Sequence, residues 1–211
     1  MTRYKNRQQA GRRLGKELNA YRGRDDVLVL GLPRGGVPVA DQVALTLQVP
    51  LSVFIVRKVG VPGQAELAMG AIASGGLQVV NESIMQSLGI SAEKFARAAD
   101  AEAAILGARE QAFRGGREAP DPSGKIVILV DDGIATGATM RVAVKALRQS
   151  APGKLIIAVP VAAPDTCREL AGEVDELVCP LQPPNFGAVG MWYEDFRQTG
   201  DDEVQAILEK Y

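Results

Sequence analysis

Residues 126–140, with the sequence IVILVDDGIATGATM, carry the strongest fold signal in this chain. The first five residues are an uninterrupted apolar run, which suits a parallel strand buried on both faces. Two adjacent acids follow, Asp131 and Asp132, and a turn rich in glycine and threonine leads into a helical pattern that starts at Ala138. The stretch predicts a strand, a tight loop and a helix, with the acids at the sheet edge where α/β proteins bind ligands.

The loop after the acids has the composition of an anion-binding site. Gly133 and Gly137 permit tight turns, so backbone N–H groups and the N-terminus of the next helix converge on one anionic group. Thr136 and Thr139 add hydroxyl donors. A phosphate monoester fits this loop, and vicinal sugar hydroxyls could donate to the two carboxylates beside it. The alternative is an acidic turn without a ligand, as in receiver-like domains.

This acid pair with its glycine- and threonine-rich turn resembles the phosphoribosyl diphosphate (PRPP) motif of type I phosphoribosyltransferases. The resemblance implies transfer of 5-phosphoribosyl from PRPP to a nitrogenous acceptor, with release of diphosphate. It also implies Mg²⁺ as cofactor, bound mostly by PRPP and water, with Asp131 and Asp132 as weak protein ligands. The PRPP-binding residues that it implies are Asp131, Asp132, Gly133, Ile134, Ala135, Thr136, Gly137, Ala138 and Thr139.

A second strand-to-helix loop lies near the N-terminus. An apolar run at 27–30 predicts a strand, residues 38–47 predict a helix, and GLPRGG lies between them. On its own, this loop is equally typical of a plain turn and of a binding site. Its glycines permit close approach of the backbone, and its arginine can bind a diphosphate bidentately. It resembles the diphosphate loop of bacterial xanthine-guanine phosphoribosyltransferases, a loop that in this family often holds a non-proline cis peptide. The resemblance implies that diphosphate is bound by Pro33, Arg34, Gly35 and Gly36.

A third strand is predicted at 51–56, followed directly by Arg57 and Lys58. At the carboxyl end of a strand, these two cations are expected to contact the diphosphate and the transition state. The resemblance implies that the flexible loop 57–76 closes over the site as a lid, although its glycines and proline suit an ordinary surface turn equally well. Residues 66–73 and 77–80 predict an antiparallel hairpin attached to the main sheet.

The C-terminal residues 180–211 are rich in proline, glycine and aromatic residues. We expect either a small apolar core at the sheet edge or a hood that stacks on a planar base, with Phe186 and, less strongly, Trp192 as the stacking residues. The hood resembles that of hypoxanthine-guanine phosphoribosyltransferases. Such enzymes usually place an acid where this chain has Ala135 and a lysine after the next strand, so hypoxanthine and guanine are disfavoured as acceptors.

Length and composition set the remaining expectations. The 211 residues, 46% of them apolar, predict an α/β fold with a mainly parallel twisted sheet flanked by helices. We expect a core at 1–179, including an N-terminal helix at 6–21, and a hood with a terminal helix at 180–211. The formal charge of −1 argues against nucleic-acid or membrane partners, and the absence of histidine excludes histidine-based triads. The hypothesis is a cytoplasmic homodimeric enzyme that binds PRPP and a small-molecule acceptor; the alternatives are a non-catalytic PRPP sensor and a domain for another phosphorylated sugar.

Overall fold

The apolar run at 126–130 forms β6 (Ile126–Val130), the middle strand of a five-stranded sheet. The computed structural model describes residues 3–211 of the chain. The sheet has the order β2–β1–β6–β7–β8, and every neighbouring pair is parallel. The other four strands are β2 (Leu51–Val53), β1 (Val27–Gly31), β7 (Lys154–Ala158) and β8 (Glu176–Val178). The predicted α/β class is confirmed.

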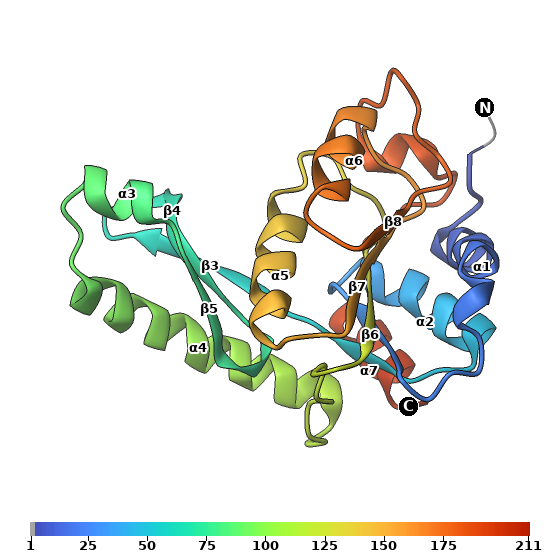
Figure 1. Cartoon of the computed structure of the whole chain (residues 1–211), viewed down its shortest axis with the longest axis horizontal. Helices are drawn as coiled ribbons and strands as arrows, with labels where there is room; N and C mark the ends of the chain where they lie inside the picture. Colours follow the sequence, from blue (N-terminus) through green and yellow to red (C-terminus); the bar gives the residue numbers. More distant parts are fainter. Residues whose placement is uncertain (1–2) are drawn as a thin grey trace.

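Helices cover both faces of this sheet, as Figure 1 shows. α5 (Ala138–Gln149) and α6 (Pro164–Ala171) lie on one face. The opposite face carries α1 (Arg7–Glu17), α2 (Gly36–Leu47) and α7 (Asp201–Leu208). Successive strand residues point to opposite faces, so Leu129 packs in one core with Leu147 of α5, whereas Ile128 packs in the other with Leu14 of α1. Both faces are apolar, which explains why the strands read as continuous hydrophobic runs.

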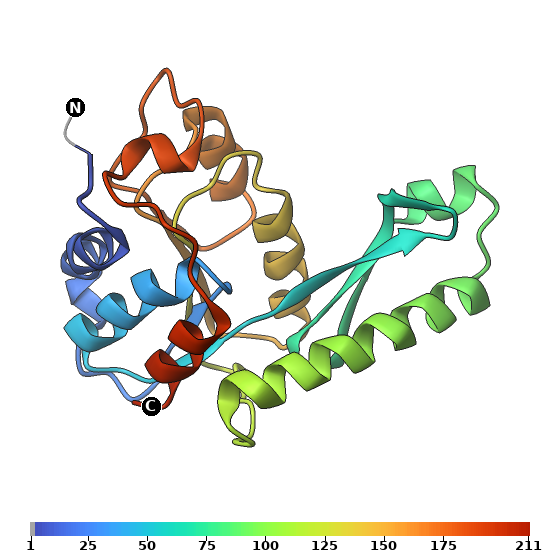
Figure 2. The same cartoon turned by 180° about the vertical axis from the view of Figure 1, so that it is seen from behind.

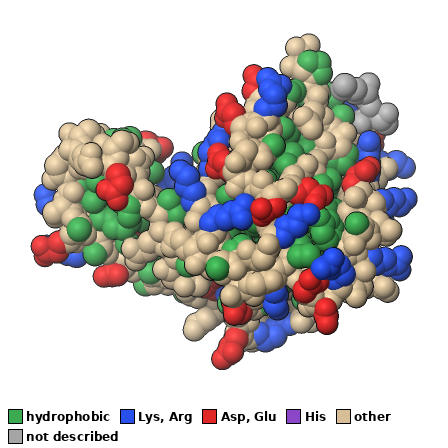
Figure 3. Space-filling view, viewed as in Figure 1, with side chains coloured by type: hydrophobic (Ala, Val, Ile, Leu, Met, Phe, Trp, Pro, Cys, Tyr) green, Lys and Arg blue, Asp and Glu red, His purple; other side chains and the backbone are tan. Residues whose placement is uncertain are grey.

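A second sheet projects from this body. It consists of β3 (Val56–Val61), β4 (Gln64–Ala73) and β5 (Leu77–Val80), paired antiparallel. With α3 (Glu82–Ser87) and α4 (Ala92–Arg114) it forms an extension that we call the arm, residues 56–114. Figures 1 and 2 show the arm reaching away from the body, and in Figure 3 it stands as a separate lobe. Ser91 caps α4, because its hydroxyl accepts from the Lys94 N–H.

Three predictions for this region are wrong. The expected strand at 51–56 is two strands, since β2 ends at Val53 and β3 begins at Val56. Arg57 and Lys58 therefore lie inside β3, and most of segment 57–76 is extended sheet rather than loop. The predicted hairpin pairs as expected but belongs to the arm, not to the main sheet. Antiparallel pairing gives the backbone of this segment hydrogen-bond partners that a loop would find only in water.

The N-terminal segment meets residues 192–194 above the carboxyl edge of the main sheet. Tyr4 forms a β-bridge with Tyr193, and its N–H donates to the Trp192 carbonyl oxygen. Residues 179–200 are irregular except for the 3₁₀ turn η3 (Val189–Trp192). Two further 3₁₀ turns are η1 (Asn19–Tyr21), which follows α1 and shortens the predicted N-terminal helix, and η2 (Ser74–Gly76). Across residues 3–211, no helix combines the length and apolar character needed to span a membrane.

Candidate functional site

Hydrogen bonds to residues 161–166 anchor the loop between β6 and α5 at Ile134 and Ala135. Ile134 is buried, its N–H donates to the Val161 carbonyl oxygen, and the Ala163 N–H donates back to Ile134. The Thr166 hydroxyl donates to the Ala135 carbonyl oxygen at 2.7 Å. Within residues 3–211, the N–H groups of Ala135, Thr136 and Gly137 have no protein acceptor. Together with the N-terminus of α5, these groups can bind an anion.

A pocket of about 220 Å³ lies over this loop. Eight of the nine residues of the predicted PRPP motif line it, the exception being Asp132. Met140 and Val189 complete the lining. Val189 belongs to η3 in the C-terminal segment, and a side chain on Gly133 would lie 2.5 Å from its Cγ1 atom. The sequence analysis missed Val189, because an isolated valine in an irregular segment carries no motif signal.

The second predicted loop lies directly against the acid pair. β1 and β6 are neighbours, so their carboxyl ends bring the two loops together. A Cβ atom on Gly35 would lie 2.1 Å from Oδ2 of Asp132, and one on Gly36 would lie 2.8 Å from the Cα atom of Asp131. The N–H groups of Arg34 and Gly35 have no protein acceptor in the described part of the chain. The Pro33–Arg34 peptide is cis, a feature that the resemblance left open for this loop.

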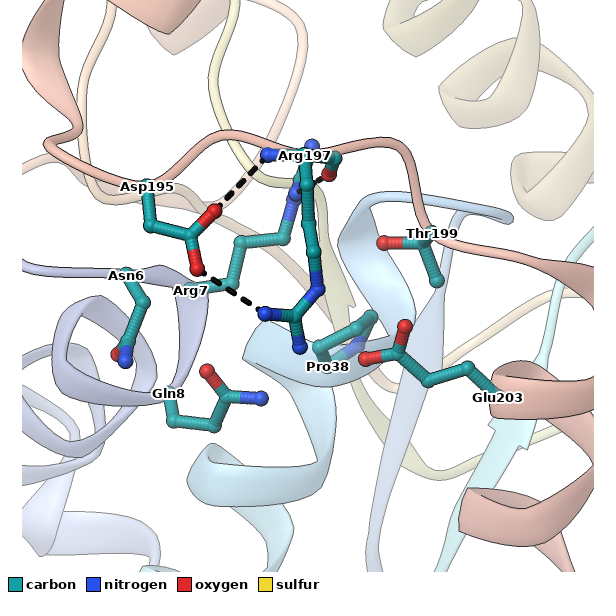
Figure 4. A pocket seen from close by; sticks show the side chains of 8 residues that line it. All are labelled: Asn6, Arg7, Gln8, Pro38, Asp195, Arg197, Thr199 and Glu203. Atoms are coloured by element: carbon teal, nitrogen blue, oxygen red, sulfur yellow. Dashed lines mark hydrogen bonds and ion pairs between the residues drawn. The ribbon is translucent and has the colours of Figure 1, made fainter.

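Arg7 of α1 and Tyr193 of the C-terminal segment hold Asp132. The Arg7 guanidinium contacts Oδ2 of Asp132 through Nε and Nη2, each at 2.8 Å. The Tyr193 hydroxyl donates to the Asp132 carbonyl oxygen at 2.6 Å. Figure 4 shows Arg7 reaching from α1 toward the C-terminal segment near Arg197. The cavity in that view measures only about 10 Å³, so α1 and the C-terminal segment pack closely there.

The two carboxyl groups differ electrostatically. Burial and the neighbouring Asp132 charge raise the pKa of Asp131 well above its usual 3.8. Burial also raises the pKa of Asp132, but the Arg7 guanidinium opposes that rise. A ligand that brings hydroxyl donors or a cation to this pair would relieve the repulsion.

The side chains of Arg34 and Arg57 are directed to acids other than Asp131 and Asp132. Arg34 points toward the start of α7, with Nη1 3.7 Å from Oδ1 of Asp201. Arg57 is paired with Glu102 of α4, at 2.6 Å between Nη2 and Oε2. Lys58 is exposed on the arm. The structure thus brings the two backbone loops together but directs the Arg34 and Arg57 side chains to acidic partners elsewhere.

Phe186 and Trp192 take part in an apolar cluster beside the N-terminal segment. Phe186 is buried with Tyr4 and Tyr193, and Trp192 packs against the same cluster. The Trp192 indole N–H donates to the Phe186 carbonyl oxygen at 2.8 Å. These contacts favour the small apolar core over base stacking for Phe186, which is only 7% exposed.

The donor set available to a metal ion is small. Within residues 3–211, no group of three or more histidine, cysteine, aspartate or glutamate side chains could bind one. Oδ2 of Asp132 is engaged by Arg7, which leaves Asp131 and the second oxygen of Asp132. These oxygens fit a hard cation such as Mg²⁺ only if a ligand and water complete its coordination.

Comparisons with known proteins agree with this geometry. A family model described as "Phosphoribosyl transferase domain" matches residues 1–191. The chain is 43% identical, over its whole length, to the Mycobacterium tuberculosis protein named "Putative phosphoribosyl transferase Rv0571c". It covers 47% of that protein, so it spans about half the length of this curated relative.

Two solved structures are also similar. The crystal structure of TT1426 from Thermus thermophilus superposes with a TM-score of 0.86 at 39% identity, covering 99% of both chains. The AQ2163 protein from Aquifex aeolicus has a TM-score of 0.50 at 13% identity, covering 86% of this chain and 78% of its own; this likeness concerns the fold alone. From the family match over residues 1–191, with the site geometry in agreement, the chain belongs to the phosphoribosyl transferase domain family.

Proposed function

We propose that this chain transfers the 5-phosphoribosyl group of PRPP to a nitrogen atom of a small acceptor and releases diphosphate. One observation supports this most directly: two loops with unpartnered N–H groups in the described part of the chain meet at a single acid pair. In this proposal the loop at 133–139 binds the 5-phosphate, and the ribose hydroxyls donate to Asp131 and Asp132. The loop at 33–36 binds the diphosphate through its backbone.

The proposed reaction breaks the bond between the anomeric carbon and a diphosphate oxygen and forms a bond to the acceptor nitrogen, which loses a proton. Its transition state resembles an oxocarbenium ion, so catalysis depends on orientation and charge stabilisation by a preorganised site. When bound with PRPP, Mg²⁺ would neutralise charge on the departing diphosphate. A role for Arg57 at the diphosphate requires that its ion pair with Glu102 opens.

The acceptor class follows from the side chains around the pocket. Ala135 and Val189 lie beside the proposed ribose site, and neither can exchange a proton with an acceptor. A 6-oxopurine therefore finds no side-chain acid or base at these positions, which keeps hypoxanthine and guanine disfavoured. We propose a different nucleobase as the acceptor.

The test measures diphosphate release from magnesium PRPP across a panel of purine and pyrimidine bases, with PRPP binding followed by calorimetry. Asp131→Asn and Asp132→Asn should weaken PRPP binding through the ribose, and Thr136→Ala should weaken it through the 5-phosphate. Ser83→Ala, which removes an exposed hydroxyl on the arm, is the control and should bind PRPP normally.

Each outcome of this test has a defined meaning. Release with one base supports the enzyme and identifies its acceptor. Tight PRPP binding without release from any base would instead favour a PRPP sensor. If the chain does not bind PRPP, the proposal is wrong and the site serves another phosphorylated sugar. The homodimer is a separate proposal, which sedimentation analysis tests.

A further inference from the structure

Arg7 makes more specific contacts than a residue that only ties a helix to the body. It is the first residue of α1, yet its side chain is only 10% exposed. Its Nη1 atom donates to the Arg197 carbonyl oxygen at 2.7 Å, and its guanidinium carbon lies 4.0 Å from the centroid of the Phe196 ring. The remaining nitrogens, Nε and Nη2, both contact Asp132. The guanidinium is thus held on its face and at each of its nitrogens.

The contacts with Asp132 use one carboxylate oxygen only. Both Arg7 nitrogens lie 2.8 Å from Oδ2, which also faces Gly35. Oδ1 makes no hydrogen bond within the described chain. A fully buried side-chain oxygen without a hydrogen-bond partner occurs only at Glu110 in the described residues, so Oδ1 of Asp132 is not fully buried. It is therefore accessible from outside the protein. An aspartate held through one oxygen presents the other in a fixed direction, which suits a hydroxyl donor on a ligand.

Packing around Tyr193 fixes the backbone in the same way. The Tyr193 hydroxyl donates to the Asp132 carbonyl oxygen, and the Tyr193 ring stacks on Phe196 with the centroids 5.0 Å apart. Phe196 in turn lies under Arg7. The three side chains therefore form one connected unit, which joins the N-terminal helix and the C-terminal segment to a single residue of the site.

We propose that Arg7 is a positioning residue, which holds Oδ2 of Asp132 so that Oδ1 accepts a ribose hydroxyl of PRPP. This inference rests on the proposed function, because it names PRPP as the ligand. Arg7 does not touch the substrate and acts only through Asp132. An arginine suits this position better than a lysine, because its planar fork can bind the carboxylate and the Arg197 carbonyl oxygen at the same time.

The test is a double-mutant cycle on PRPP affinity, measured by calorimetry with magnesium PRPP. Arg7→Gln should weaken binding by about 10- to 100-fold, because a misoriented Asp132 loses a hydrogen bond between a charged group and the ribose, and such a bond contributes about this factor. Arg7→Lys should fall between Arg7→Gln and the wild type. In the Asp132→Asn background, Arg7→Gln should have little further effect, because residues that act through one another are not additive. Arg97→Gln removes an exposed arginine–glutamate pair on the arm and is the matched control, expected to bind PRPP normally.

The cycle separates positioning from a merely structural role. Equal losses from Arg7→Gln in both backgrounds would show that Arg7 supports the fold, and would overturn the inference. So would unchanged affinity in Arg7→Gln. If Arg7→Gln does not fold by thermal melting, Arg7→Lys replaces it in the cycle and the same criteria apply. If the wild type does not bind PRPP, the proposed function fails with this inference; if only the cycle is additive, the proposed function stands.

Discussion

Replacing Gly35 with alanine tests whether the two loops form one site. The Gly35 backbone has φ −62° and ψ −31°, a conformation that alanine adopts without strain. Any effect of Gly35→Ala therefore comes from the added methyl group. That methyl would lie 2.1 Å from Oδ2 of Asp132 and 2.8 Å from its Cγ atom, whereas an ordinary contact begins at 3.4 Å.

The carboxylate cannot move away freely. Oδ2 of Asp132 must move away by about 1.3 Å, the difference between 3.4 Å and 2.1 Å. Arg7 holds this same oxygen at 2.8 Å. Loss of a hydrogen bond to a charged carboxylate costs about 1.5–3 kcal/mol, which corresponds to about 10- to 150-fold in affinity at about 1.36 kcal/mol for each factor of ten. We expect Gly35→Ala to weaken PRPP binding by about this factor in calorimetry, while the circular dichroism spectrum stays that of a folded chain.

Gly107→Ala is the matched control. Gly107 lies inside α4, and a Cβ atom there would meet nothing within 4 Å. Alanine in a helix interior is favoured over glycine by about 0.5–1 kcal/mol, so this variant should melt slightly higher and bind PRPP normally. Wild-type PRPP affinity in Gly35→Ala would refute the reasoning, because it would mean that Asp132 is not used or that the two loops are further apart than described.

Two further predictions concern the C-terminal segment and the opposite edge of the sheet. Phe186→Ala should lower the free energy of unfolding by about 3–5 kcal/mol, as expected for a buried aromatic; a normal melting temperature with a raised Michaelis constant for the acceptor would instead support base stacking. Partial burial raises the pKa of Glu176, but hydrogen bonds from Lys154 and Tyr21 outweigh this and hold it below its ordinary 4.5. Because its folded-state pKa is depressed, Glu176 stabilises the fold above pH 4.5, and this contribution falls as the pH drops through the folded-state value. Urea unfolding of the wild type and Glu176→Gln should therefore differ above pH 4.5 and converge as the pH falls below the folded-state pKa of Glu176; a constant difference would contradict the assignment.

The parts of the fold that the sequence predicted well depend on local signals. The bounds of β6 and α5 follow from an apolar run and a helical pattern that adjoin the acid pair. The arm was predicted poorly because strand pairing between β3 and β4 is a tertiary choice. From the sequence alone, an arginine that follows an apolar run, such as Arg57, is equally compatible with the end and with the middle of a strand.

The candidate site shows a sharper contrast between what local sequence patterns predict and what only long-range contacts determine. The groups proposed to face a ligand lie in two short loops. The glycine, threonine and acid pattern marks the first loop, whereas the second alone is as typical of a plain turn and was identified by its resemblance. What orients them could not be found in this way, because Arg7 is separated from Asp132 by 125 positions and no local pattern marks one arginine among the eight basic residues of the first 24. Tyr193 approaches Asp132 from 61 positions away in the other direction. A motif can therefore identify the groups that meet a ligand, whereas their direction is set by side chains that only the folded chain brings to them. Substitutions at Arg7 and Tyr193 would leave the motif intact while changing what it can bind, so an intact motif is by itself insufficient evidence of an intact site.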